Sequence, residues 1–195
     1  TENRMNKYET YEWDNIWIEH ANEIGRKRVA YIGDSISVGT RRIATARTNE
    51  EILFDGFGTS KALDNPYFKD SIRLFLKQLP NIDTVLFNNG LHGWNLDDGI
   101  EYKALYDEMI QFILGEIKGT KLYILLTTAV AKDADDERVK FRNIAAREIA
   151  EKYAIPIIDL YNITSVNINE ISSDGVHPTE PLYEKIADEI IRNIR

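Results

Sequence analysis

Short apolar runs alternate along this chain with longer segments of helical periodicity, and this alternation is the feature that most limits the fold. Each run is a few residues long and mostly continuous in hydrophobicity, as is typical of strands buried on both faces of a parallel sheet. The pattern predicts a doubly wound α/β chain, a flavodoxin-like three-layer α/β/α sandwich with a five-stranded parallel sheet. The expected strands are Val29–Ile32, Ile52–Phe54, Thr84–Asn88, Leu122–Thr127 and Ile155–Ile158.

The segments between these runs carry apolar residues at four-residue spacing, which predicts helices with one face on the sheet. Two such stripes are Leu105, Met109, Ile113 and Ile117, and Phe141, Ala145 and Ile149. A last helix is expected to have Pro178 near its first turn, where the missing N–H costs nothing, and to bury Leu182, Ile186 and Ile190.

The length of 195 residues fits one domain, 1–195. Its N-terminal segment, residues 1–27, is rich in aromatic side chains and is expected to form an amphipathic helix packed across that domain. The aromatic residues include Tyr8, Tyr11, Trp13 and Trp17. A wall of a substrate cleft and a dimer contact are the alternative roles for this segment.

Composition excludes several classes of function. The formal net charge is −8, so no basic stripe is available to bind nucleic acid. The absence of cysteine excludes disulfides, thiolate metal sites and cysteine nucleophiles. No apolar run is long enough to span a membrane, and the opening TENRMNKYET lacks a signal-peptide core, which favours a soluble, cytoplasmic protein unless a leader has been trimmed. Oligomeric state leaves no readable signature.

The segment VAYIGDSISVG places Gly33, Asp34 and Ser35 at the end of the first expected strand, just before a helix. This end of a parallel strand is where open α/β sheets bind ligands, and a helix N-terminus directs N–H groups at developing negative charge. Ser35 is therefore a candidate nucleophile. Taken alone, the motif also fits a turn followed by a helix cap.

Near the other end, SSDGVHPTE places Asp174 three residues before His177. At this spacing the carboxylate can hold one imidazole nitrogen while the other faces a serine hydroxyl. The alternative is again a helix cap, made by Asp174 or Thr179, with His177 merely exposed.

Together, the strand-end Gly-Asp-Ser and the distal Asp-x-x-His resemble the first and last sequence blocks of the SGNH (GDSL-like) hydrolase family, over roughly residues 28 to 190. The resemblance implies a Ser-His-Asp triad of Ser35, His177 and Asp174. It also implies that the glycine of the second block is Gly58, in ILFDGFGTSKAL, whose N–H would serve an oxyanion hole together with the N–H of Ser35.

The third block of the family usually reads Gly-x-Asn-Asp, whereas this chain has VLFNNGLHGW. Aligning Gly90 with the glycine of the block places His92 at the asparagine position. A neutral imidazole has one N–H that can bind an oxyanion, and family variants with Gly-x-His, several of them thought to act on acylated carbohydrates, support this alignment. A shifted register would offer Asn89 or Asn88 instead.

The sequence therefore predicts a serine esterase that acts on small carboxylic esters, with O-acetyl groups on carbohydrates as one candidate substrate. Trp94, Tyr67 and Phe68 could stack a sugar ring beside the serine or could simply pack. No cofactor or metal is expected, since an SGNH mechanism needs no ion and no metal-ligand motif is present. An acyltransferase that uses the same triad and a non-catalytic ligand-binding module are the alternatives.

Overall fold

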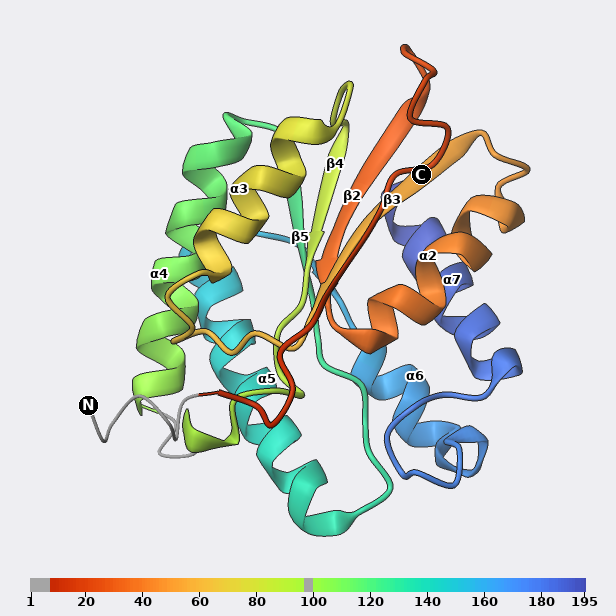
Figure 1. Cartoon of the computed structure of the whole chain (residues 1–195). Helices are drawn as coiled ribbons and strands as arrows, with labels where there is room; N and C mark the ends of the chain where they lie inside the picture. The colour runs from red at the N-terminus through yellow and green to blue at the C-terminus, as the bar shows by residue number, and fades with distance from the viewer. Residues whose placement is uncertain (1–7, 97–99) are drawn as a thin grey trace.

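Six strands form a single sheet in the structure, a computed structural model that describes residues 8–96 and 100–195 (Figure 1). Their order across the sheet is β1-β3-β2-β4-β5-β6. The strands are β1 (Asp14–Trp17), β2 (Lys27–Gly33), β3 (Ile52–Thr59), β4 (Thr84–Phe87), β5 (Lys121–Leu125) and β6 (Ile157–Ile158). The strands β2 to β6 run parallel, which confirms the five predicted strands and the flavodoxin-like order, with boundaries shifted by a few residues.

Helices cover both faces of this sheet, as predicted. One face is covered by α2 (Ser35–Arg47), α6 (Leu160–Val166) and α7 (Glu180–Ile194), and the other by α3 (Phe68–Gln78), α4 (Ile100–Ile117) and α5 (Asp133–Lys152). Two short 3₁₀ turns, η1 (Trp94–Leu96) and η2 (Ile168–Glu170), lie in the connecting loops.

Side chains alternate between the two hydrophobic cores along each central strand. In β2, Ala30 and Ile32 point into the core with α3, α4 and α5, whereas Val29 and Tyr31 point into the core with α2 and α7. This two-residue period on a strand buried on both faces explains why the strands read as continuous apolar runs.

The N-terminal segment differs from the prediction. Residues 1–7 lie outside the described residues, and the rest of the segment contains no helix but the edge strand β1, antiparallel to β3. The pairing supplies the backbone hydrogen bonds that a helix would otherwise make internally. It leaves Ile16 and Trp17 partly exposed rather than packed across the sheet.

Two smaller expectations about helices are also corrected. In the predicted stripe of α5, Ala145 and Ile149 are buried as expected, but Phe141 is 51% exposed, because the buried face continues through Arg142 and Val139 instead. The last helix begins at Glu180, so Pro178 precedes it and Pro181 occupies its first turn. Within the described ranges, no helix is both long and apolar enough to cross a membrane.

A buried ion pair connects β2 and β3. The Arg28 guanidinium donates to both carboxylate oxygens of Asp55, at 2.9 and 3.0 Å, and both side chains are fully buried. The same guanidinium donates to the carbonyl oxygens of Glu19, His20 and Glu23. The pair therefore fixes the turn that connects β1 to β2.

Removing one partner of this pair should strongly destabilise the fold. Asp55→Ala is expected to lower the free energy of unfolding by about 3–5 kcal/mol, because it leaves the Arg28 charge buried without its counter-ion. Urea unfolding followed by circular dichroism measures the change. Asp188→Ala, which removes an exposed partner of Arg47, is the control and should leave the unfolding midpoint nearly unchanged. Similar midpoints for the two variants would contradict the expectation.

Candidate active site

Ser35 is the first residue of α2 and follows the carboxyl end of β2. The helix cap is made by the preceding residue: Asp34 Oδ1 accepts the N–H of Ile36 at 2.9 Å. The Ser35 hydroxyl is thus not required for capping. The N–H of Ser35 lies in the first turn, where helical N–H groups have no intrahelical acceptor.

His177 and Asp174 complete a hydrogen-bonded chain with this hydroxyl. His177 Nε2 lies 2.8 Å from Ser35 Oγ, and His177 Nδ1 lies 2.7 Å from Asp174 Oδ2. The carboxylate can only accept a hydrogen bond, so it favours a proton on Nδ1 and leaves the Nε2 lone pair for the serine proton. The structure brings together the three residues predicted as a triad.

The loop that carries Asp174 and His177 is held by its own backbone. Asp174 Oδ1 accepts the N–H groups of Val176 and His177 at 2.8 and 2.9 Å, and the His177 carbonyl accepts the N–H of Ser172 at 2.8 Å. Gly175 has a φ of +78°, a left-handed conformation that suits glycine, and its carbonyl accepts the N–H of Ala131. The imidazole is therefore oriented before any ligand binds.

The pKa values of two carboxyl groups near Ser35 are shifted in opposite directions. The backbone N–H groups of His177 and Val176, followed by the His177 side chain, hold the pKa of Asp174 well below its usual range, so this carboxylate stays ionised at mildly acidic pH. Burial raises the pKa of Asp34, an effect that His92 and His177 oppose electrostatically.

A cavity of about 330 Å³ opens at Ser35. Besides the triad and His92, its wall contains four apolar side chains, three charged side chains and one glycine. The apolar ones are Leu91, Trp94, Val130 and Val176, and the others are Glu9, Lys132, Asp135 and Gly175. The volume is in the range of pockets that bind small organic molecules.

The structure distinguishes between the candidates of the third block. His92 lines the cavity, whereas Asn89 is buried and is not part of the lining, with its amide nitrogen donating to the Lys61 carbonyl at 3.1 Å. The Asn88 amide nitrogen also has buried hydrogen-bond partners, since it donates to the Leu125 carbonyl and to Thr127 Oγ1. Of the three side chains, only that of His92 lines the cavity that contains Ser35.

Gly58 does not present its N–H to this cavity. The N–H of Ser60 donates to the carbonyl of Trp13, and antiparallel pairing alternates, so Gly58 and Asn15 form the next hydrogen-bonded pair. The N–H of Gly58 therefore faces β1 rather than Ser35, which contradicts its predicted role as an oxyanion donor. Glycine is needed here for packing, because a Cβ would lie 2.4 Å from Val38 Cγ2 in α2.

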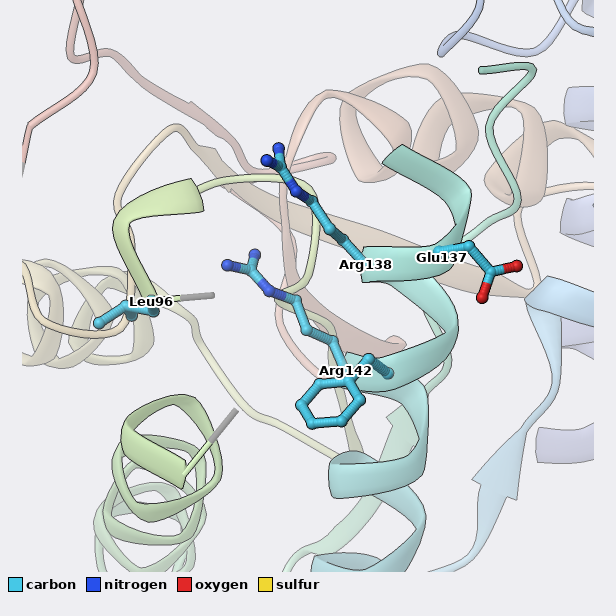
Figure 2. Close-up of a pocket in the computed structure, with 5 residues that line it drawn as sticks. Leu96, Glu137, Arg138 and Arg142 are labelled. Atoms are coloured by element: carbon cyan, nitrogen blue, oxygen red, sulfur yellow. The ribbon is translucent and has the colours of Figure 1, made fainter. Parts of the chain in front are cut away.

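Arg142 anchors the loop that carries His92. From α5 its guanidinium donates to the carbonyl oxygens of Gly90, His92 and Gly93, at 3.1, 2.6 and 2.6 Å. It also lies 4.6 Å from the ring centroid of Trp94. Figure 2 shows Arg138 and Arg142 extending from the same side of α5 toward the segment with Leu96. The third-block loop is thus fixed by a helix far along the sequence.

Several residues of the cavity wall were not predicted from the sequence, and two of the three aromatic residues considered for it lie outside the wall. Glu9, Lys132 and Asp135 line the cavity, but no motif marks them. Trp94 lies in the wall as considered, whereas Phe68 is buried in the core and the exposed Tyr67 is not part of the lining. Across residues 8–96 and 100–195, no three histidine or carboxylate side chains are grouped as metal ligands.

Comparison with known proteins finds relatives by structure alone. No protein-family model matches the sequence, and no curated protein matches it. Among solved structures, an acetylxylan esterase from Geobacillus stearothermophilus is 14% identical, with a TM-score of 0.64 over 86% of this chain and 94% of its own.

Two further similar structures are hydrolases by name. A lipase/acylhydrolase from Enterococcus faecalis is 17% identical, with a TM-score of 0.64 over 86% of this chain and 95% of its own. A GDSL-like lipase from Bacteroides thetaiotaomicron is 16% identical, with a TM-score of 0.64 over 87% of this chain and 88% of its own. At these identities the likeness establishes the architecture, and the chain therefore has the fold of the GDSL-like, or SGNH, hydrolases.

Proposed function

We propose that this protein is a serine esterase that hydrolyses small carboxylic esters through an acyl-enzyme intermediate. The observation that carries the proposal is the continuous chain from Ser35 Oγ to His177 Nε2, at 2.8 Å, and from His177 Nδ1 to Asp174 Oδ2, at 2.7 Å. A nucleophile, a base and a carboxylate that orients the base are the groups that acyl transfer requires.

In the acylation step, His177 Nε2 takes the proton of Ser35 as Oγ attacks the ester carbonyl carbon. The carbonyl oxygen becomes an oxyanion, for which the N–H of Ser35 and the His92 side chain are the proposed donors. Asp174 stabilises the imidazolium that forms. Collapse of the intermediate breaks the ester C–O bond, and the departing alcohol oxygen receives the proton from His177.

In the deacylation step, a water molecule gives a proton to His177 Nε2 and attacks the acyl carbon. The second tetrahedral intermediate releases the carboxylic acid and returns the proton to Ser35 Oγ. The solvent exposure of the site supports water as the acyl acceptor. The side chains of His177 and Asp174 are 43% and 51% exposed, so water can reach the base. A transferase would be expected to exclude water at this stage. A binding module would have no use for an aligned nucleophile and base.

O-acetyl groups on carbohydrates are the proposed substrate class. The cavity is small and combines an aromatic wall, Trp94, with charged groups such as Lys132 and Asp135, which suits a short acyl group on a polyhydroxy alcohol. Similar structures that are named acetyl xylan esterases give further support.

Ser35→Ala is expected to reduce hydrolysis of p-nitrophenyl acetate to background, because no other group in the triad can form the acyl-enzyme. A fluorophosphonate probe should label wild type at Ser35, as read by peptide mass spectrometry, and should not label the variant. Ser165→Ala, at a partly exposed serine in α6, is the control and should retain turnover and labelling. Turnover by Ser35→Ala that matches wild type would refute the proposal.

Asp174→Ala should leave roughly 10- to 100-fold more activity than Ser35→Ala, because the carboxylate orients the base whereas the serine forms the bond. Steady-state kcat on the same ester checks the order of the two variants. Equal loss in both would mean that the imidazole cannot reach Ser35 without its carboxylate.

His92→Ala is expected to lower kcat by roughly 10²–10³, the usual loss for one oxyanion donor. Asn89→Ala should act mainly on stability, because the Asn89 amide is buried and donates to Lys61. Parallel measurement of kcat and thermal unfolding separates the two effects. Unchanged turnover in His92→Ala would remove His92 from the oxyanion site.

A further inference from the structure

Glu9 lies in the wall of the cavity that contains Ser35, although it is remote from Ser35 in the sequence. Its Oε1 lies 3.3 Å from His92 Nδ1 and accepts the N–H of Gly93 at 3.1 Å. One carboxylate oxygen thus contacts both the imidazole and the backbone of the third-block loop.

The residues that follow Glu9 in the chain are held by further side-chain contacts. The Glu12 carboxylate accepts from Ser60 Oγ at 2.6 Å, and Asp14 Oδ1 accepts from Lys61 Nζ at 2.6 Å. The ring of Trp13 meets the imidazole of His92 edge-on, with centroids 6.2 Å apart. These contacts hold the segment against the loop after β3 and limit where Glu9 can point.

We propose that Glu9 is a positioning residue for His92, which it orients and supports electrostatically as the oxyanion donor; this inference rests on the proposed esterase function. A carboxylate can only accept, so the contact places a proton on Nδ1 and leaves Nε2 as the ring nitrogen free to serve the substrate. Nε2 then donates to an oxyanion only when the ring carries both protons, a cation that the Glu9 carboxylate stabilises.

Other titratable or charged groups lie near His92. Asp34 interacts with it electrostatically, Arg142 of α5 binds its carbonyl oxygen, and the same cavity is lined by Lys132, Asp135, Asp174 and His177. Among the described residues, Glu9 is the one whose carboxylate lies within ion-pairing distance of the His92 ring. We therefore expect the negative charge of the Glu9 side chain, and not only its shape, to affect kcat.

Glu9→Gln separates charge from shape, because its amide oxygen can still accept from Nδ1 and from Gly93. We expect kcat to fall about tenfold with KM little changed, the difference between a charge-assisted and a neutral hydrogen bond. Glu50→Gln is the matched control: it removes a carboxylate 3.3 Å from the imidazole of His20, outside the cavity, and should leave kcat unchanged.

A double-mutant cycle with His92→Asn distinguishes this role from a purely structural one. An asparagine amide donates without an added proton, so Glu9→Gln should change kcat less than about twofold in that background. An equal tenfold loss in both backgrounds would overturn the inference, since it would mean that Glu9 acts through Gly93 alone. No loss in the wild-type background would also overturn it.

Imidazole ¹⁵N NMR tests the contact independently of activity, and the three histidines of the chain make assignment simple. Nδ1 of His92 should be protonated in the wild-type protein, and its signal should shift in Glu9→Gln while those of His20 and His177 stay unchanged. An unchanged His92 signal would refute the inference. A protein with the expected His92 signal but without fluorophosphonate labelling at Ser35 would instead contradict the esterase function and, with it, the catalytic role of Glu9.

Discussion

The candidate active site depends on the common direction of the five parallel strands. Because β2 and β4 end at the same edge of the sheet, the turn with Ser35 and the loop with His92 meet there. The loop before α7 then needs only to fold over this edge to place His177 against Ser35. Residues separated by more than a hundred positions are thus brought within hydrogen-bonding distance by sheet topology.

The two sides of the site are stabilised in different ways. The side with the base is local: within one short loop, Asp174 binds both the imidazole and the backbone N–H of His177. The proposed oxyanion side is assembled from distant parts of the chain, since Arg142 of α5 binds the carbonyl oxygens around His92 and Glu9 contacts its ring. Changes far along the sequence are therefore more able to alter the oxyanion side than the base.

This difference explains what could be predicted from the sequence. Ser35, Asp174 and His177 lie in two short motifs that together resemble the first and last blocks of a known family, and the buried strands were predicted from their continuous hydrophobicity. Gly58 was assigned wrongly because a motif does not reveal toward which neighbour an N–H points, and that direction is set here by pairing with β1. The same pairing replaced the expected N-terminal helix, whose aromatic pattern fits either structure. Glu9 could not be found at all, because its contact joins residues 83 positions apart.

The electrostatics of the cavity suggest why a histidine suits the third block of this chain. Glu9, Asp34, Asp135 and Asp174 surround the site, with Lys132 the one lysine in the cavity wall. In the proposed mechanism, this excess of carboxylates would favour an imidazolium on His177 during attack but disfavour the oxyanion that forms at the same moment. A neutral amide would offset that penalty with a dipole alone. In the proposed mechanism, the imidazole of His92, held by Glu9 at Nδ1, adds a charge-assisted donor at the oxyanion, so the site can keep the carboxylates that help its base.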